Sequence, residues 1–307
     1  MYRNRSAYYI WEIPFFTIPY PTILGHESIG RVIKVGSKVR NFKVGDLVTR
    51  VGAPPTADGK IAAHWGGYAE LGIAKDHWAM CKDGVPKEEW NSYRVNQIIP
   101  TGIEPAEATM IITWRETLSY MKRMGIGRGC SVLILGSGGN GLAFANHALN
   151  LGAANVVMTG NDLRRTVAQA IGVTDYYNYR DDRLVDRLIY DYPDGFDFII
   201  DAVGKAGEIN KMLPLIKDGG TIGIYGIDDY DKITITPNKA GKTFKFYGGA
   251  YDEEETHEQV ISYIRKGKLK AHYWLNLDAP FTLDSINEAF EAIQQKKIIK
   301  ALIKLSE

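Results

Sequence analysis

The sequence predicts a two-domain α/β protein in which a doubly wound parallel sheet follows a glycine-rich domain of short strands. A chain of 307 residues is long enough to form two domains. Apolar residues make up 45% and charged residues 24%, the balance of a globular chain with a sizeable core. Short apolar stretches between glycines fill the first hundred residues, and strand-like and helix-like segments alternate after residue 130.

The first domain begins with β patterning. Residues 28–39 place Ile29, Val32 and Val35 among charged residues and glycines, which is typical of hairpins and small barrels. Residues 47–75 are rich in proline and glycine and read as loops. Residues 106–124 then place apolar side chains at helical spacing, so we expect one helix there.

The second domain shows the clearest alternation. Its apolar runs are short enough for strands buried on both faces, and they predict strands at 132–135, 156–158, 198–200 and 221–225. Helical segments lie between them, at 142–151 and in a stretch that ends at Ile171. Strands and helices that alternate in this way predict parallel pairing and a doubly wound sheet.

The last sixty residues return to mixed structure. An acidic segment at 252–256 predicts the start of a helix that continues through Ile264. We expect a strand at 274–277, a helix at 283–295 and a final strand at 301–305.

A glycine-rich loop follows the first strand of the second domain. Gly136, Gly138 and Gly141 fit the pattern G-x-G-x-x-G, and Gly139 and Asn140 complete it. The first glycine allows the tight turn, the second lets backbone approach a pyrophosphate, and the third lets the helix pack closely on the sheet. A purely structural turn is the alternative. The position between a buried strand and a helix favours dinucleotide binding.

The end of the second strand indicates which nicotinamide cofactor is preferred. An NAD site needs a carboxylate there for the ribose 2′-hydroxyl, and a 2′-phosphate repels it. Here the strand ends in Thr159, Gly160 and Asn161, with Arg164 just beyond. Asp162 comes late and is better placed to cap the next helix. The sequence therefore favours NADP(H) over NAD(H).

Further motifs resemble a known family. The segment Gly25-His26-Glu27-Ser28-Ile29-Gly30 is similar to the G-H-E-x-x-G signature of medium-chain dehydrogenase/reductases of the zinc-type alcohol/polyol dehydrogenase branch. The stretches 45–48, 66–70 and 201–204 resemble other parts of that family. The resemblance implies a GroES-like β-barrel catalytic domain at 1–113 and 250–307, and a Rossmann domain at 114–249. It also implies that Val203 and Gly204 border the cofactor.

The same resemblance implies a degenerate zinc site. Family members bind zinc through a Cys, the motif His and a third ligand from the helix before the Rossmann domain. In this sequence Asn4 stands at the first of these positions and Thr113, beside Ile112, at the last. Neither is a usual zinc ligand. His26 and Glu27 are then the remaining metal candidates, and we expect zinc to be weak or absent, with the motif kept as a structural turn.

Other catalytic and cofactor positions are also implied by resemblance. Ser6 matches the hydroxyl that begins the proton relay, and Tyr9 lies near the position of a relay His. Arg5 and Lys300 match basic positions near the cofactor phosphates, although a single Arg or Lys is more often a solvated surface charge. His64 is a candidate donor in a loop. Relatives carry further strands before the relay Ser, so either the start is placed too late or the catalytic domain is short.

These features favour an NAD(P)-dependent oxidoreductase that acts on a small alcohol or carbonyl substrate, with Ser6, Tyr9, His26 and Glu27 as catalytic candidates. Two alternatives stay open: a zinc-free enone or quinone reductase, and a nucleotide-binding protein with little turnover. A formal charge of +1 argues against nucleic acid. No segment reads as a membrane span or a signal peptide. We expect a cytoplasmic homodimer or homotetramer.

Overall fold

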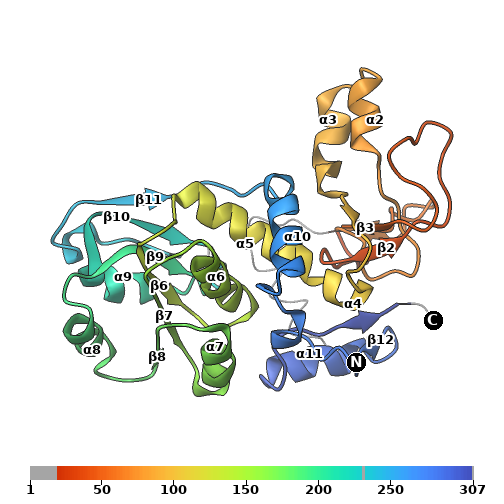
Figure 1. The fold of residues 1–307 in the computed structure, drawn as a ribbon. Helices are drawn as coiled ribbons and strands as arrows, with labels where there is room; N and C mark the ends of the chain where they lie inside the picture. The colour runs from red at the N-terminus through yellow and green to blue at the C-terminus, as the bar shows by residue number, and fades with distance from the viewer. Residues whose placement is uncertain (1–18, 230–231, 306–307) are drawn as a thin grey trace. The chain divides into compact units, whose positions relative to one another are not determined.

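The computed structural model describes residues 19–229 and 232–305 and divides the chain into two units (Figure 1). The first unit comprises Met1–Glu116 and Asp252–Glu307, and the second comprises Thr117–Tyr251. The sequence places these boundaries at 113/114 and 249/250. The second unit is thus an insertion in the chain of the first.

The second unit is built on one six-stranded sheet of parallel strands, in the order β11-β10-β9-β6-β7-β8. Its strands are β6 (Ser131–Leu135), β7 (Asn155–Gly160), β8 (Asp175–Asn178), β9 (Phe196–Asp201), β10 (Ile216–Ile224) and β11 (Phe244–Tyr247). The chain winds outward from β6 in both directions, which confirms the predicted doubly wound sheet. The direction of winding reverses between β6 and β9, and ligands bind at this point in such sheets.

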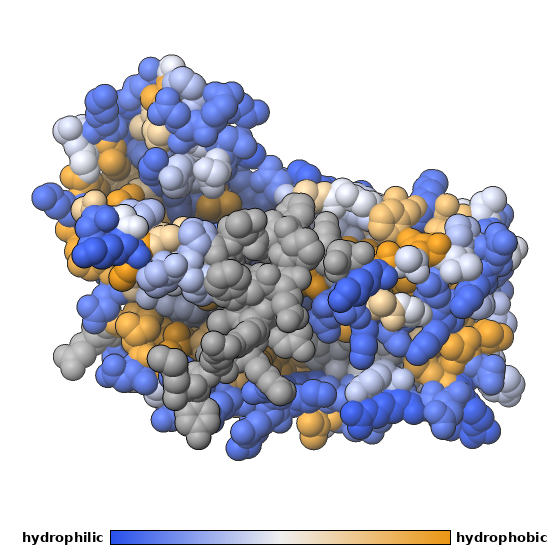
Figure 2. Space-filling model, turned by 180° about the vertical axis from the view of Figure 1, so that it is seen from behind, coloured by the Kyte–Doolittle hydropathy of each residue, from blue (hydrophilic) through white to orange (hydrophobic). Residues whose placement is uncertain are grey.

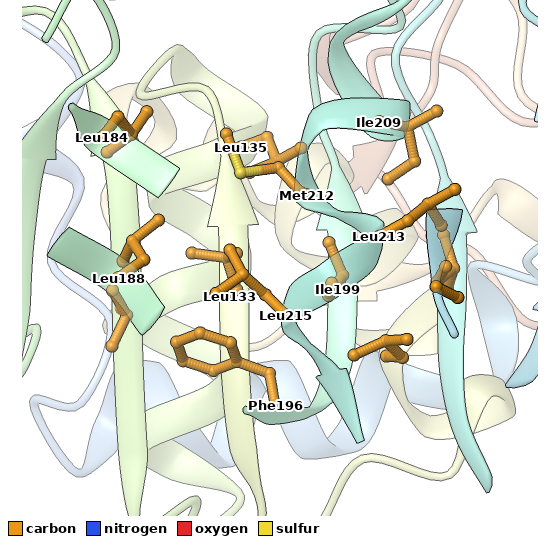
Figure 3. Close-up of a cluster of buried hydrophobic side chains, with 14 residues drawn as sticks. Leu133, Leu135, Leu184, Leu188, Phe196, Ile199, Ile209, Met212, Leu213 and Leu215 are labelled. Atoms are coloured by element: carbon orange, nitrogen blue, oxygen red, sulfur yellow. The ribbon is translucent and has the colours of Figure 1, made fainter. Parts of the chain in front are cut away.

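Helices cover the sheet on its two faces. The helices of this unit are α6 (Gly139–Asn150), α7 (Arg165–Ile171), α8 (Leu184–Asp191) and α9 (Glu208–Met212), with the C-terminal part of α5 (Met110–Met124). Figure 3 shows Leu184 and Leu188 of α8 in the same apolar cluster as Leu133 of β6 and Met212 of α9. Each such side chain contributes about 1.5–3 kcal/mol when fully buried. This core holds the carboxyl ends of β6, β7 and β9 in place.

The first unit consists of short strands and helices. Antiparallel β2 (Ile29–Arg31), β3 (Leu47–Thr49) and β5 (Ile98–Ile99) form its largest sheet. Two parallel pairs accompany it: β1 (Thr22–Ile23) with β4 (Ala62–Ala63), and β12 (Phe281–Thr282) with β13 (Ile303–Lys304). The helices are α2 (His77–Lys82), α3 (Lys87–Trp90), α4 (Pro105–Ala108), α10 (His257–Arg265), α11 (Ile286–Gln294) and the start of α5.

Two expected elements differ in the structure. The helix expected at 106–124 is divided into α4 and α5 at Thr109, whose hydroxyl donates to the Ala106 carbonyl oxygen over 2.7 Å. The strand expected at 274–277 is wrong. Trp274 instead follows a 3-10 turn and packs edge-on against Trp114, with 5.7 Å between ring centroids. Its apolar character reflects burial rather than strand pairing.

Among residues 19–229 and 232–305, no helix has the length and apolar character needed to cross a membrane. On the face drawn in Figure 2, hydrophilic residues are interspersed with separate apolar groups.

Candidate functional site

The glycine loop between β6 and α6 shows a different constraint at each glycine. Gly136 has φ +99°, and a Cβ there would come within 2.6 Å of the Val203 side chain. A Cβ at Gly141 would meet the Gly136 carbonyl oxygen at 2.0 Å. A Cβ at Gly138 would meet no atom within 4 Å. Gly136 and Gly141 therefore serve the fold, whereas Gly138 leaves open space on the backbone.

Helix α6 begins directly after this open position. Gly138 is its N-cap residue, with Gly139 and Asn140 at its first two positions. The first N–H groups of a helix lack intrahelical partners and carry the positive end of its dipole. With no side chain at residue 138, an anionic group can approach these groups closely. The loop thus fits a pyrophosphate.

The turn after β9 lies next to the glycine loop. Asp201 accepts hydrogen bonds from the backbone N–H groups of Val203 and Gly204, both over 2.9 Å. Burial raises the pKa of Asp201 above its usual range. The Ala202 N–H also donates to the Leu135 carbonyl oxygen over 2.9 Å, which links this turn to the end of β6. The two turns therefore meet at the edge where the winding reverses.

The end of β7 carries hydroxyl and amide groups but no carboxylate. Thr159 is buried, and the Tyr176 hydroxyl donates to the Asn161 carbonyl oxygen over 2.6 Å. A Cβ at Gly160 would meet the Ser137 hydroxyl at 2.1 Å and the Tyr176 hydroxyl at 2.2 Å. Gly160 is thus required for close packing. Sequence reasoning missed Ser137 and Tyr176, because β8 brings Tyr176 here from another part of the chain.

Asp162 carries the carboxylate that is nearest in sequence to the end of β7, and this carboxylate is already hydrogen-bonded to other side chains. One oxygen accepts from Arg165 over 2.8 Å and the other from Asn178 over 2.6 Å. It therefore pairs with side chains and does not cap the next helix as expected. Arg164 is partly buried, and this burial lowers its pKa.

In the first unit, His26 and Glu27 follow β1. Lys300 lies close to both carboxylate oxygens of Glu27, at 2.6 and 2.5 Å, and the Thr113 hydroxyl donates to the same carboxylate. Burial opposes ionisation of Glu27, but Lys300, His26 and Thr113 together outweigh burial and lower its pKa to about 2. Glu27 is thus a fully ionised carboxylate bound to an ammonium group.

His26 is neutral at pH 7 because burial lowers its pKa to about 4, with Arg50 and Lys300 adding to this effect and Glu27 opposing it. The centroid of its ring lies 5.1 Å from the centroid of the Trp65 ring. The His64 ring also contacts Trp65, with 3.9 Å between the ring centroids. The structure therefore brings His26 and His64 together around one tryptophan.

A buried ionic cluster accompanies this site, and sequence reasoning did not predict it. Arg50 binds Glu116 over 2.6 Å and also binds Glu253, and Arg115 binds the other oxygen of Glu253 over 2.6 Å. Burial and the neighbouring Glu253 raise the pKa of Glu116. We refer to Arg50, Arg115, Glu116 and Glu253 as the ionic cluster.

Four of the predicted residues, Asn4, Arg5, Ser6 and Tyr9, lie outside the described residues. Lys300 lies on Glu27, as described above. The assignments of individual catalytic and cofactor-binding residues stay predictions.

A unit of short strands, interrupted in sequence by a doubly wound sheet with a glycine loop at its switch point, defines the class of medium-chain dehydrogenase/reductases. Residues 3–84 match the family model described as the alcohol dehydrogenase GroES-like domain, and residues 139–265 match that of a zinc-binding dehydrogenase. The chain belongs to the zinc-type alcohol dehydrogenase family, an oxidoreductase family.

Individual relatives agree with this placement. D-arabinitol dehydrogenase 1 of Uromyces fabae is 23% identical over 302 residues, which cover 94% of this chain and 83% of that protein. L-threonine 3-dehydrogenase of Aliivibrio fischeri strain MJ11 is 28% identical over 260 residues, 82% of this chain and 74% of that protein. The alcohol dehydrogenase TADH from Thermus sp. ATN1 has the same fold, with a TM-score of 0.76 at 19% identity over 99% of this chain and 90% of that one.

The residues described do not fit the zinc ion that the family implies. Within 19–229 and 232–305, no three His, Cys, Asp or Glu side chains are grouped so that they could hold a metal. Glu27 is bound by Lys300 and Thr113, and Ile112 is fully buried and apolar. Zinc needs thiolate, imidazole or carboxylate donors. The ammonium of Lys300 supplies the positive charge beside Glu27.

We therefore predict less than one zinc per chain in protein purified without added metal or chelator, measured by plasma emission spectrometry. Should some zinc be present, His26→Ala is expected to remove it, because His26 is the best remaining donor. Stoichiometric zinc that survives dialysis against a chelator would contradict this prediction.

Proposed function

We propose that this chain is an NADP(H)-preferring oxidoreductase that interconverts an alcohol and the corresponding carbonyl compound. The observation that supports this most is the edge of the sheet formed by β6, β7 and β9. It combines an open glycine at the start of α6 with a β7 end that has no free carboxylate. A 2′-phosphate is tolerated there, and Arg164 is the cation proposed to attract it.

When bound, NADPH would supply the hydride that reduces the carbonyl carbon, and the carbonyl oxygen would take up one proton from the protein. The chain's own residues bind and orient. Gly138, Gly139 and Asn140 receive the pyrophosphate, and Asp201 keeps the neighbouring turn rigid through its two backbone hydrogen bonds.

In the first unit, the proposed roles of the side chains follow from the family resemblance and from their charge states. Ser6 is proposed to donate the proton from its hydroxyl to the substrate oxygen, and Tyr9 is proposed as a further group of the proton relay. His26 is neutral near pH 7, so it can accept or donate one hydrogen bond without bringing a charge. Lys300 and Glu27 form a fixed ion pair beside it.

A second candidate is zinc-free reduction of an enone or a quinone. The specific observation in its favour is that Lys300 and Thr113 occupy the Glu27 carboxylate, so the donor set for a metal is incomplete. In a conjugated substrate the developing negative charge is delocalised onto a distant oxygen, which reduces the need for a strong Lewis acid.

One set of measurements separates these functions. Turnover of alcohols, saturated aldehydes, enones and quinones at saturating NADPH is compared with the binding of NADPH alone. Turnover of aldehydes supports the first proposal, and turnover confined to enones or quinones supports the second. NADPH binding without turnover of any substrate would indicate a nucleotide-binding protein that is not an active oxidoreductase.

The cofactor preference has a direct test. We expect NADPH to bind more tightly than NADH, because the end of β7 has no free carboxylate that would repel the 2′-phosphate or accept from a ribose hydroxyl. Nucleotide fluorescence titration measures both affinities. An NADH affinity equal to that for NADPH in the unmodified protein would rule out the assignment.

The proposal also includes a cytoplasmic location and a homodimer or homotetramer. Light scattering coupled to gel filtration reports the oligomeric state, and a monomer at micromolar concentration would contradict it.

A further inference from the structure

The first unit contains a small pocket between α11, β13 and the ion pair of Glu27 with Lys300. Its volume is about 160 Å³, and every described residue that lines it belongs to the first unit. Helix α11 lies next to β12, the strand that pairs with β13 (Figure 1). An apolar cavity of about 150 Å³ is large enough to hold benzene, so this pocket has room for one small ring.

The walls of the pocket are apolar. Four of its lining residues, at positions 286, 289, 290 and 293, have the spacing of a single face of α11, and Ile303 of β13 lines it as well. Such a face is normally covered by a core, yet Ile293 is 39% exposed. Ala289 is buried and small, so it leaves room in the middle of this face. A compact apolar body can therefore be received against α11.

The polar end of the pocket is the ion pair. Lys300 uses two of its three N–H groups on Glu27, and its backbone N–H donates elsewhere, to Trp274. Among the described residues, Oε1 of Glu27 accepts from two donors and Oε2 from Lys300 alone. The two side chains stay 19% and 31% exposed, so a ligand can reach them. One N–H donor and one acceptor position are therefore left for a ligand.

Tyr68 adds a third polar group to the same pocket. Its backbone N–H donates to the Leu24 carbonyl oxygen over 2.9 Å, and its ring packs edge-on against Phe290, with 6.3 Å between ring centroids. Its hydroxyl takes part in no hydrogen bond with the described residues. Burial and the nearby Glu27 raise the pKa of Tyr68, so the phenol is neutral at pH 7. It can both donate and accept.

We propose that this pocket binds a neutral monohydroxy compound with a compact apolar body, such as cyclohexanol. Its hydroxyl would donate to Glu27 and accept from Lys300 or Tyr68, and its ring would lie against α11. A carboxylate head would face Glu27 and an ammonium head would face Lys300, and neither would gain a net counter-charge for the water that it loses. Apolar pockets with a few convergent polar groups are typical ligand sites.

This site goes beyond the proposed oxidoreductase function and does not rest on it. The glycine loop that is proposed to receive the cofactor belongs to the second unit, whereas the described lining of the pocket lies in the first. We therefore expect the site to bind its ligand whether or not NADPH is bound.

The first test compares three ligands that share one ring. Calorimetric titration of the whole protein at pH 7 without NADPH is expected to give a dissociation constant of about 1 mM or tighter for cyclohexanol. Cyclohexylamine and cyclohexanecarboxylate, both charged at this pH, are expected to bind about tenfold more weakly or less. No detectable binding of cyclohexanol at roughly 10 mM, or equal binding of either charged ligand, would overturn the proposal.

Two variants test the two ends of the pocket. Ile293→Asp places a charge on the apolar wall and is expected to weaken cyclohexanol binding about fivefold or more. Leu283→Asp is the matched control, because Leu283 is similarly exposed, at 37%, and does not line the pocket. Tyr68→Phe is expected to weaken cyclohexanol binding about threefold to tenfold and to leave toluene binding unchanged. Equal affinities for cyclohexanol in Ile293→Asp and Leu283→Asp, or in Tyr68→Phe and the unmodified protein, would overturn the proposed site.

A cofactor comparison separates this site from the reaction centre. The cyclohexanol affinity is expected to be the same with and without saturating NADPH, and also in the Gly138→Val variant. Binding that requires NADPH would place the alcohol at the reaction centre and overturn the proposal. If NADPH fails to bind, or no substrate is turned over, while the cyclohexanol results hold, then only the proposed oxidoreductase function is contradicted.

Discussion

Gly138→Val is expected to weaken NADP(H) binding by roughly a hundredfold or more while leaving the fold intact. The pyrophosphate must approach the backbone at the start of α6, and a branched side chain at residue 138 would occupy that space. The protein itself tolerates the change, because a Cβ there meets no atom within 4 Å and φ is −73°. Fluorescence titration with NADPH measures the effect.

Gly127→Val is the matched control. Gly127 also has open space around its Cβ position and no positive φ, but it lies in the turn after α5, away from the glycine loop. We expect its NADPH affinity to equal that of the unmodified protein. Gly136→Val is not a useful comparison, since the strained φ and the contact with Val203 would disturb folding. Normal NADPH binding by Gly138→Val would show that this loop is not the phosphate-binding site.

The doubly wound unit could be predicted because its signals are local. The apolar run at 132–135, the glycine pattern after it and the absence of an acid after Met158 each lie within a few neighbouring residues. Such patterns depend on backbone periodicity and turn chemistry, which a short segment largely determines. The strand expected at 274–277 shows the limit, since burial of Trp274 gives the same apolar pattern as a buried strand.

The charge pairs of the first unit could not be predicted in this way. Lys300 and Glu27 are separated by 273 positions, and Arg50 and Glu253 by 203. Sequence reasoning treated Lys300 as a phosphate contact or a surface charge, because a single Lys carries no signal that names its partner. The short helix start expected at 252–256 was recognised from its acids, but their role in binding Arg50 and Arg115 depends on tertiary packing.

Among the described residues, this ionic cluster pairs two guanidinium groups with two carboxylates, and this pairing determines how it responds to substitution. Two guanidinium groups, Arg50 and Arg115, face two carboxylates, Glu116 and Glu253, and Arg115 and Glu253 are almost completely buried. The pKa of Glu116 is raised by burial and by Glu253, so the folded state binds a proton there more readily than the unfolded state does. Its contribution to stability is therefore complete below the unfolded value of 4.5 and is lost as the pH rises through the folded pKa.

Arg115→Met is accordingly expected to destabilise the protein by about 3–5 kcal/mol at pH 8, because it leaves one buried carboxylate without a counter-charge. That loss lowers the midpoint of thermal unfolding by roughly 10 °C. The deficit should shrink on going from pH 8 to pH 5, since protonation of Glu116 restores neutrality. Glu253→Gln in the same chain also restores a balanced pair, Arg50 with Glu116, and is expected to recover most of the stability. Calorimetry of the two single variants and the double variant gives the coupling free energy. Additive losses that do not depend on pH would show that Arg115 acts through its packing and not through its charge.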